Sequence, residues 1–223
     1  MRVISTNVGK PSSYEFGGVT LRSSMRRQPT LDGLHVFFDH VVGDKFAVPN
    51  YHGIKEAVVY AFSSATFPAL SDLLTQDVGV GNVGENLTMD ELLESELMIG
   101  DEYEIGETRL KVSGPRYPCN HLNFCFQRAT ALEIFAKFRR PGVYFEVLNE
   151  GVIRRDDELT LVKQAGGDLS VLELFDALRA LKDLSAGRST LDDLKPIAVR
   201  VLNNNFVPEF HRVRFQKFAT SLS

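Results

Sequence analysis

The chain has 223 residues, of which 43% are hydrophobic and 24% are charged, as in ordinary soluble globular proteins. This composition excludes the disordered, collagen-like and disulfide-rich classes, and no apolar run approaches the roughly 18 residues of a membrane span. The net charge of −4 argues against a general nucleic-acid binder. We therefore expect neither a nucleic acid nor a membrane as a partner.

The first part of the chain is predicted to be mostly short strands separated by turns. In chain order the pattern predicts a strand at 14–22 with a glycine interruption, strands at 34–38 and 56–62, a helix at 64–77, a glycine-rich loop at 78–84, a hairpin of 99–105 and 108–113 about Gly106, a short helix at 129–139, and strands at 143–148 and 158–163. Many short strands with turns favour a barrel or a sandwich.

The pattern changes to helical periodicity after Gly166-Gly167. Ser170 and Glu173 form a capping box before one apolar helix, a second runs over about 190–202, and a third begins near Pro208. The predicted fold class is therefore mainly β with α. A β-barrel domain is expected over residues 1–165, followed by a small three-helix domain over 166–223.

Charge is unevenly distributed along the chain. Residues 72–107 hold eleven acidic and no basic side chains, whereas residues 108–140 hold seven Lys/Arg and one acid. Residues 1–30 carry five Lys/Arg and one acid. The two basic segments could converge on a small anion, although solvated faces are the alternative for either one.

The densest group of reactive side chains lies between Ser113 and Asn123. Two prolines and a glycine stiffen this predicted loop, and Arg116 and His121 flank Cys119. Positive surroundings favour the thiolate, which attacks electrophiles or binds metals. A small buried thiol is the alternative for Cys119.

Cys125 lies between two phenylalanines, which favours a structural role in the core. The spacing to Cys119 is not that of a thioredoxin-like redox pair, and C-x-H-x-x-x-C is not a usual zinc motif. Two cysteines only, with no apolar signal segment at the N-terminus, predict a reducing, cytoplasmic location.

Three polar residues in predicted turns are further candidates. His52, which comes just before a predicted strand, could deliver a proton or bind a ligand, or simply brace a turn. Glu85 and Asn86 close the glycine-rich loop and could bind a ligand or brace that loop. The glycines of this loop fit G-x-G-x-x-G, but no βαβ context follows.

Taken together, these motifs resemble the MOSC domain, the family named after the C-terminal region of molybdenum cofactor sulfurases. The resemblance is carried in order by Gly43-Asp44, His52-Gly53, Gly84-Glu85-Asn86-Leu87-Thr88, Gly100-Asp101 and the stretch from Pro115 to Asn123. It covers about residues 10–163, and the three helices that follow resemble the YiiM-like subgroup.

The resemblance implies a β-barrel that binds the molybdopterin form of molybdenum cofactor, with Cys119 as the thiolate ligand of molybdenum. Arg116, His121, Asn123 and Lys55 would contact the cofactor, and Glu85 and Asn86 would fix the pterin or the substrate. His52 would be a catalytic proton donor. The family commonly has lysine at the position of His121, which would be charged only part of the time near neutral pH.

The activity that the resemblance implies is the two-electron reduction of N-hydroxylated compounds, such as N-hydroxylated bases, to amines. No iron–sulfur or flavin motif is present, so an external reductase would have to donate electrons. The alternatives are a carrier of the cofactor without turnover and a sulfur carrier that uses a Cys119 persulfide. The oligomeric state is not predicted.

Overall fold

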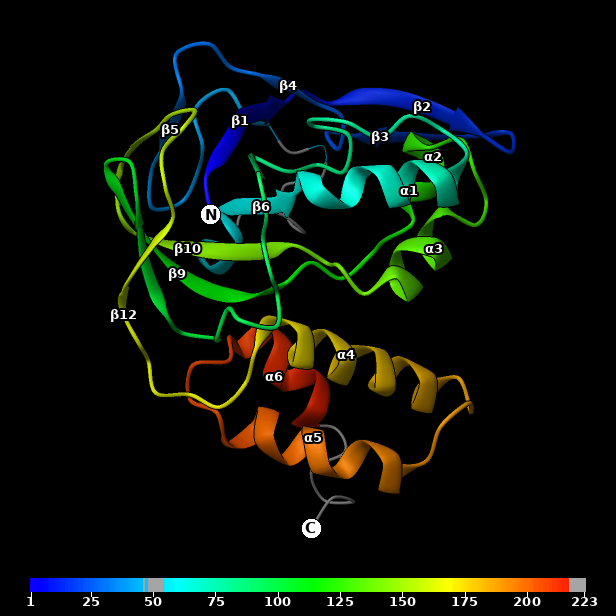
Figure 1. Cartoon of the computed structure of the whole chain (residues 1–223). Helices are drawn as coiled ribbons and strands as arrows, with labels where there is room; N and C mark the ends of the chain where they lie inside the picture. The colour runs from blue at the N-terminus through cyan, green and yellow to red at the C-terminus, as the bar shows by residue number, and fades with distance from the viewer. Residues whose placement is uncertain (46, 48–53, 217–223) are drawn as a thin grey trace.

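The computed structural model describes residues 1–45, 47 and 54–216 and shows a mixed α/β protein built on one large sheet (Figure 1). Eight strands pair in the order β12-β8-β9-β10-β6-β7-β1-β4. Their bounds are Thr160–Lys163 (β12), Glu102–Ile105 (β8), Thr108–Pro115 (β9), Val143–Asn149 (β10), Val59–Ser63 (β6), Leu87–Met89 (β7), Val3–Gly9 (β1) and Arg27–Pro29 (β4). Only β6 and β7 pair in parallel in this sheet.

The sheet is open, and the predicted closed barrel is not confirmed. Strand pairing among the described residues leaves β12 at one edge and β4 at the other. The chain just before β12 does reach the start of β1, because the Val3 amide donates to the Asp157 carbonyl at 2.9 Å. The sheet thus curls, but its ladders do not continue into a ring.

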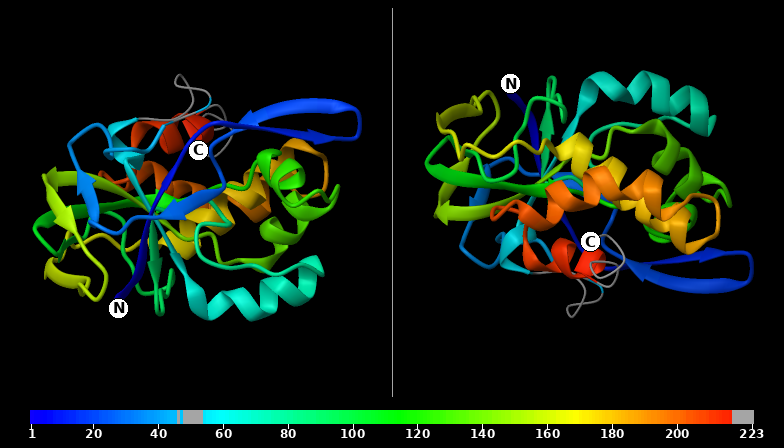
Figure 2. Two further views of the ribbon diagram at one scale, coloured as in Figure 1. Left: turned by 90° about the horizontal axis from the view of Figure 1, so that it is seen from above. Right: turned by 90° about the horizontal axis from the view of Figure 1, so that it is seen from below.

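Two small two-stranded sheets and three short helices complete the first part of the chain. The pairs are β2 (Ser12–Phe16) with β3 (Val19–Ser23), and β5 (Leu34–Val36) with β11 (Gly151–Ile153). The helices are α1 (Phe67–Leu74), α2 (His121–Cys125) and α3 (Ala131–Phe138), with 3₁₀ turns at Lys55–Ala57 and Ser64–Thr66. Figure 2 shows the β2–β3 hairpin projecting from the body of the molecule.

The C-terminal helices pack against the sheet, as Figures 1 and 2 show. They are α4 (Val171–Ser185), α5 (Leu191–Asn203) and α6 (Glu209–Gln216). Leu174 of α4 and Phe215 of α6 share one hydrophobic core with Val112 of β9 and Val143 of β10. The three predicted helices are confirmed, whereas the domain boundary at residue 165 stays a proposal.

Local sequence signals predicted most elements but missed β1, the short strands β4, β7 and β11, and helix α2. The Ser170–Glu173 capping box is present at the start of α4, and Pro196 lies inside α5. In β1, by contrast, Thr6 and Asn7 are buried next to each other, so the strand lacks the alternation of a half-exposed strand. Within the described residues no helix is long and apolar enough to cross a membrane.

Candidate functional site

The loop that carries Cys119 follows the long strand β9. This strand pairs with β10 as far as Pro115, and α2 begins at His121. Pro115 and Pro118 restrict the backbone between the two elements. The carbonyl of Cys119 accepts a hydrogen bond from the Leu122 amide at 3.1 Å, so the cysteine is held directly before the first turn of α2.

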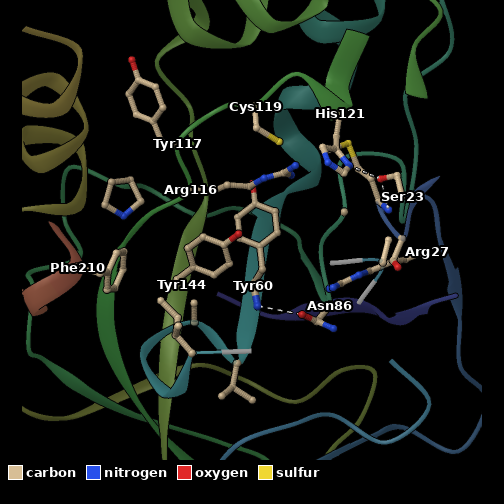
Figure 3. A pocket seen from close by; sticks show the side chains of 18 of the residues that line it. Ser23, Arg27, Tyr60, Asn86, Arg116, Tyr117, Cys119, His121, Tyr144 and Phe210 are labelled. Carbon is tan, nitrogen blue, oxygen red and sulfur yellow. Dashed lines mark hydrogen bonds between the residues drawn. The ribbon is translucent and has the colours of Figure 1, made fainter. Parts of the chain in front are cut away.

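Cys119 lines a cavity of about 250 Å³, shown in Figure 3. The walls come from the chain after β3, from β6, from the loop before β7, from the end of β9, from β10 and from α6. The lining residues are Ser23, Ser24, Met25, Arg27, Ala47, Ile54, Ala57, Val58, Tyr60, Gly84, Asn86, Pro115, Arg116, Tyr117, Cys119, His121, Tyr144, Phe210, His211 and Arg214. Three arginines and no carboxylate belong to this described lining, which favours an anionic ligand.

Arg116 is fixed close to the cysteine. Its Nη1 donates to the carbonyl of Val83, and its guanidinium lies 5.1 Å from the centre of the Tyr60 ring. Arg116 and Cys119 interact electrostatically. Tyr60 is itself held by a 2.8 Å hydrogen bond from its hydroxyl to the carbonyl of Pro141, and burial raises its pKa. Tyr60 is therefore a neutral platform under a permanent cation.

Arg27 is the most unusual charged group in the cavity. Its Nη2 lies 2.7 Å from Oδ2 of Asp44, and only 8% of its side chain is exposed. Its Nε and Nη1 atoms have no hydrogen-bond partner. Burial lowers the pKa of Arg27, and the charge of Asp44 opposes that change. The arginine thus holds two unused donors, which a bound anion can satisfy.

Asn86 and Glu85 are neighbours in the sequence but have different surroundings. Asn86 lines the cavity, where its Oδ1 accepts from the Tyr60 amide at 3.1 Å and its Nδ2 donates to Asp44 at 3.1 Å. The carboxylate of Glu85 instead accepts from the amides of Gly81 at 2.5 Å and Val83 at 3.2 Å. Glu85 therefore braces the glycine-rich loop and does not line the cavity.

His121 reaches the cavity from the start of α2. Its Nδ1 lies 2.8 Å from Oγ of Ser23, at the end of β3. Burial, followed by the positive charge of Arg116, lowers the pKa of His121. The ring is therefore charged less often near neutral pH than the sequence alone suggested.

Two other predicted site residues, Lys55 and Asn123, are not brought into the cavity lining. Lys55 is exposed and lies 3.9 Å from carboxylate oxygens of Glu56 and Glu146. Oδ1 of Asn123 accepts from the Leu132 amide at 2.8 Å, which caps the first turn of α3. His52 lies outside the described residues, so its role as a proton donor stays a prediction.

Helix α6 contributes residues that the sequence patterns did not single out. Phe210, His211 and Arg214 lie on one side of this helix and line the cavity. The helical period was visible, but nothing in it indicated which face meets the cysteine loop. Arg27 was likewise missed, although the basic character of residues 1–30 was a signal.

A protein-family comparison identifies this region of the chain. The model of the MOSC domain matches residues 48–160, which is about half of the chain and includes the cysteine loop. The chain belongs to the MOSC domain family.

Relatives of this MOSC protein include curated sequences and solved structures. YflK of Bacillus subtilis, an uncharacterized protein, is 28% identical over 169 residues, which is 76% of each chain. A Gibberella moniliformis protein named Reductase is 32% identical over 144 residues, 63% of this chain but only 26% of its own length. YiiM of Escherichia coli is 29% identical over 138 residues, 59% of each chain.

The fold comparison also points to YiiM proteins. The crystal structure of YiiM from Geobacillus stearothermophilus superposes with a TM-score of 0.74 at 24% identity and covers 97% of both chains. YiiM from Escherichia coli gives 0.69 at 21% identity and covers all of this chain and 94% of its own. The predicted resemblance to YiiM-like MOSC proteins is confirmed.

The described side chains of this MOSC domain offer few ligands for a metal ion. Among the described residues there is no group of three or more His, Cys, Asp or Glu side chains that could hold a metal ion. A metal at Cys119 would therefore need ligands from another molecule. A soft metal that arrives with its own sulfur ligands fits a site with a single thiolate.

Proposed function

We propose that this MOSC protein binds molybdenum cofactor and uses it to reduce N-hydroxylated compounds to amines. The observation that carries the proposal is the cavity in which the Cys119 thiol faces a lining of arginines without a carboxylate. MOSC domains generally associate with molybdenum cofactor, and a relative is named Reductase. The two unpartnered donors of Arg27 fit the phosphate that the pterin carries.

Four residues of the cavity have a role in this proposal. Cys119 would hold the metal, while Arg27 and Arg116 would hold the phosphate and other anionic groups. Asn86 would orient the ligand through the amide that also contacts Asp44. When bound, the cofactor would supply the two-electron chemistry, and the protein would supply orientation and electrostatics.

The reaction consumes two electrons and two protons: R–NH–OH + 2e⁻ + 2H⁺ gives R–NH₂ + H₂O. The N–O bond breaks, and the oxygen leaves as water. We propose His52 as the group that delivers a proton to the departing hydroxyl oxygen. An external reductase in the cytoplasm would donate the electrons.

Metal analysis and a reductase assay test this proposal together. The protein is expressed in a host that makes the cofactor, and molybdenum is measured in wild type, Cys119→Ser and Cys125→Ala. We expect molybdenum in wild type and Cys125→Ala, and its loss in Cys119→Ser with an unchanged circular dichroism spectrum. Cys125 is the matched control because its thiol is buried and lies 3.8 Å from Ser23 Oγ.

Turnover is measured with an aromatic hydroxylamine and reduced viologen as the electron donor. Reduction by wild type and its absence in Cys119→Ser would support the enzyme. Bound molybdenum without turnover would indicate a cofactor carrier instead. Sulfide release by a reductant in molybdenum-free protein would indicate the persulfide carrier, and near-normal turnover by Cys119→Ser would remove the cysteine from the chemistry.

A further inference from the structure

A second cavity, of about 540 Å³, lies between helices α3 and α4 (Figure 1). Tyr117 of the cysteine loop belongs to its lining, and Leu132 and Ala136 of α3 supply apolar surface. Among the described residues, only Tyr117 lines both this cavity and the one that Cys119 lines. The proposed function does not use the second cavity, which we call the α3–α4 cavity.

Tyr117 offers a hydrogen-bond donor to the α3–α4 cavity. Figure 3 shows its side chain directed away from Arg116 and Tyr144 of the first cavity. The ring packs against Phe175 of α4, with 5.9 Å between the ring centres. Burial raises the pKa of the Tyr117 hydroxyl, which therefore keeps its proton at neutral pH. Within the described part of the chain this hydroxyl has no hydrogen-bond partner.

The α3–α4 cavity carries an excess of positive charge. Its described lining holds four basic and two acidic side chains, a net charge of +2, in a chain whose net charge is −4. Both acidic groups are already in ion pairs, Glu133 with Lys137 at 2.7 Å and Asp183 with Arg188 at 2.6 Å. The other two basic side chains therefore carry the excess charge.

These two side chains are Arg179 and Lys182, which are three residues apart on α4 and so lie on one face of it. Nζ of Lys182 lies 5.7 Å from the centre of the Tyr117 ring and has no carboxylate partner among the described residues. Nη1 of Arg179 lies 3.7 Å from Oδ1 of Asp176. That same oxygen accepts from Nε of Arg139 at 3.0 Å, so one carboxylate is shared by two arginines.

We propose that the α3–α4 cavity is a binding site for a small phosphate monoester, held by Arg179, Lys182 and the Tyr117 hydroxyl. A phosphate monoester carries a charge of about −1.5 to −2 at pH 7 and offers three acceptor oxygens. It therefore matches both the net charge of the lining and the available donors. The organic part of the ester would pack on Leu132 and Ala136.

A ligand in this site would contact the cysteine loop from outside the first cavity. Tyr117 is two residues before Cys119, and Pro118 between them restricts the backbone. The site is thus distinct from the first cavity but is joined to it by one stiff segment. The proposal goes beyond the proposed function, because binding there needs neither the cofactor nor turnover.

Titration calorimetry of the full-length protein tests the site with inorganic phosphate, phenyl phosphate, glycerol 3-phosphate and phenol at constant ionic strength. We expect the three phosphates to bind with dissociation constants below about 1 mM, whereas phenol, which lacks the phosphate, should not bind. Tighter binding of phenyl phosphate than of glycerol 3-phosphate would identify an aromatic ester as the ligand, and the reverse order an aliphatic one. The proposal is overturned if none of the phosphates binds, or if phenol binds as tightly as phenyl phosphate.

Two matched variants locate the site. Lys182→Met removes one of the excess positive charges, whereas Lys195→Met makes the same change at an exposed position of α5 outside the cavity. We expect Lys182→Met to weaken the binding of phenyl phosphate about tenfold and Lys195→Met to leave it unchanged. Tyr117→Phe, which removes only the hydroxyl, should weaken binding several-fold. Equal affinities of the two lysine variants would contradict the proposal.

The arginines of the first cavity also suit a phosphate group, so their contribution is measured separately. The double variant Arg27→Met, Asp44→Asn removes a buried pair of that cavity without leaving an unpaired charge, and its affinity for phenyl phosphate should equal that of wild type. Loss of binding in this variant, with retention in Lys182→Met, would place the phosphate in the first cavity and overturn the proposal. Failure of the proposed function is distinct, because no measurement here depends on molybdenum or on turnover.

Discussion

Ser23 and His121 are 98 residues apart in the sequence, and a 2.8 Å contact joins the Oγ of one to Nδ1 of the other. The contact connects the end of β3 with the start of α2. Oγ of Ser23 also accepts from the Met25 amide at 3.2 Å and lies 3.8 Å from Sγ of Cys125. One hydroxyl therefore contacts the imidazole and fixes the strand end beside the cysteine loop.

Replacing Ser23 by Ala should lower the unfolding free energy by about 1–2 kcal/mol, because it leaves buried partners unsatisfied. Turnover should fall several-fold as His121 loses its fixed orientation. Ser24→Ala is the matched control for stability, since the Ser24 hydroxyl is buried without a partner and its loss should cost no unfolding free energy. Urea unfolding measures the unfolding free energies of the two variants, and the reductase assay measures their turnover. Equal effects of the two substitutions would contradict the role given to Ser23.

Arg27→Met should destabilise the protein by about 3–5 kcal/mol, because it leaves Asp44 buried without its positive partner. Adding Asp44→Asn removes the uncompensated charge and should recover much of that loss, while the amide oxygen can still accept from Gly9. The double variant should fold but retain little molybdenum. Chemical denaturation and metal analysis separate the two effects, and normal metal content in the double variant would remove Arg27 from the cofactor site.

His211 should make stability fall at acid pH. Burial lowers its pKa to about 3 in the folded protein, compared with about 6.5 in the unfolded chain, so between these values only the unfolded chain binds the proton. The contribution of His211 to the free energy of unfolding is therefore present in full above about pH 6.5. Below that pH it falls by about 1.4 kcal/mol per pH unit.

Between pH 6.5 and 5, wild type should thus lose about 2 kcal/mol more than His211→Phe. Guanidinium unfolding at the two pH values measures this difference. Parallel losses in the two proteins would show that the ring is solvated or paired in solution.

Gly114→Ala should destabilise the protein, since its Cβ would lie 2.8 Å from Nε2 of His211 and the backbone φ of 154° disfavours a side chain. The loss is expected to be about 2 kcal/mol or more. His211→Ala in the same chain should recover part of it by vacating the contested space. A thermodynamic cycle over the two single variants and the double variant measures this coupling, and strict additivity would show that the two residues do not meet.

Much of the local structure could be predicted because its signals are local. The capping box of Ser170 and Glu173, the hairpin about Gly106 and the start of the third C-terminal helix near Pro208 each depend on a few adjacent residues. The same holds for the cysteine loop, where two prolines flank Arg116. Strand β1 escaped prediction because Asn7 is buried and hydrogen-bonded to Thr88 at 3.1 Å, which no local alternation encodes.

The sequence by itself determined the family, the cysteine that lines the cavity and the arginine beside it, since these lie in one short motif. Only the tertiary structure decided which distant side chains share the cavity. It brought Arg27 and His211 into the cavity that Cys119 lines. It also directed the Glu85 carboxylate to the amides of its own loop, where it accepts hydrogen bonds. The physical reason is that packing between elements decides which side chains are buried and which donors lack a partner. The spacing of neighbouring residues does not encode that packing.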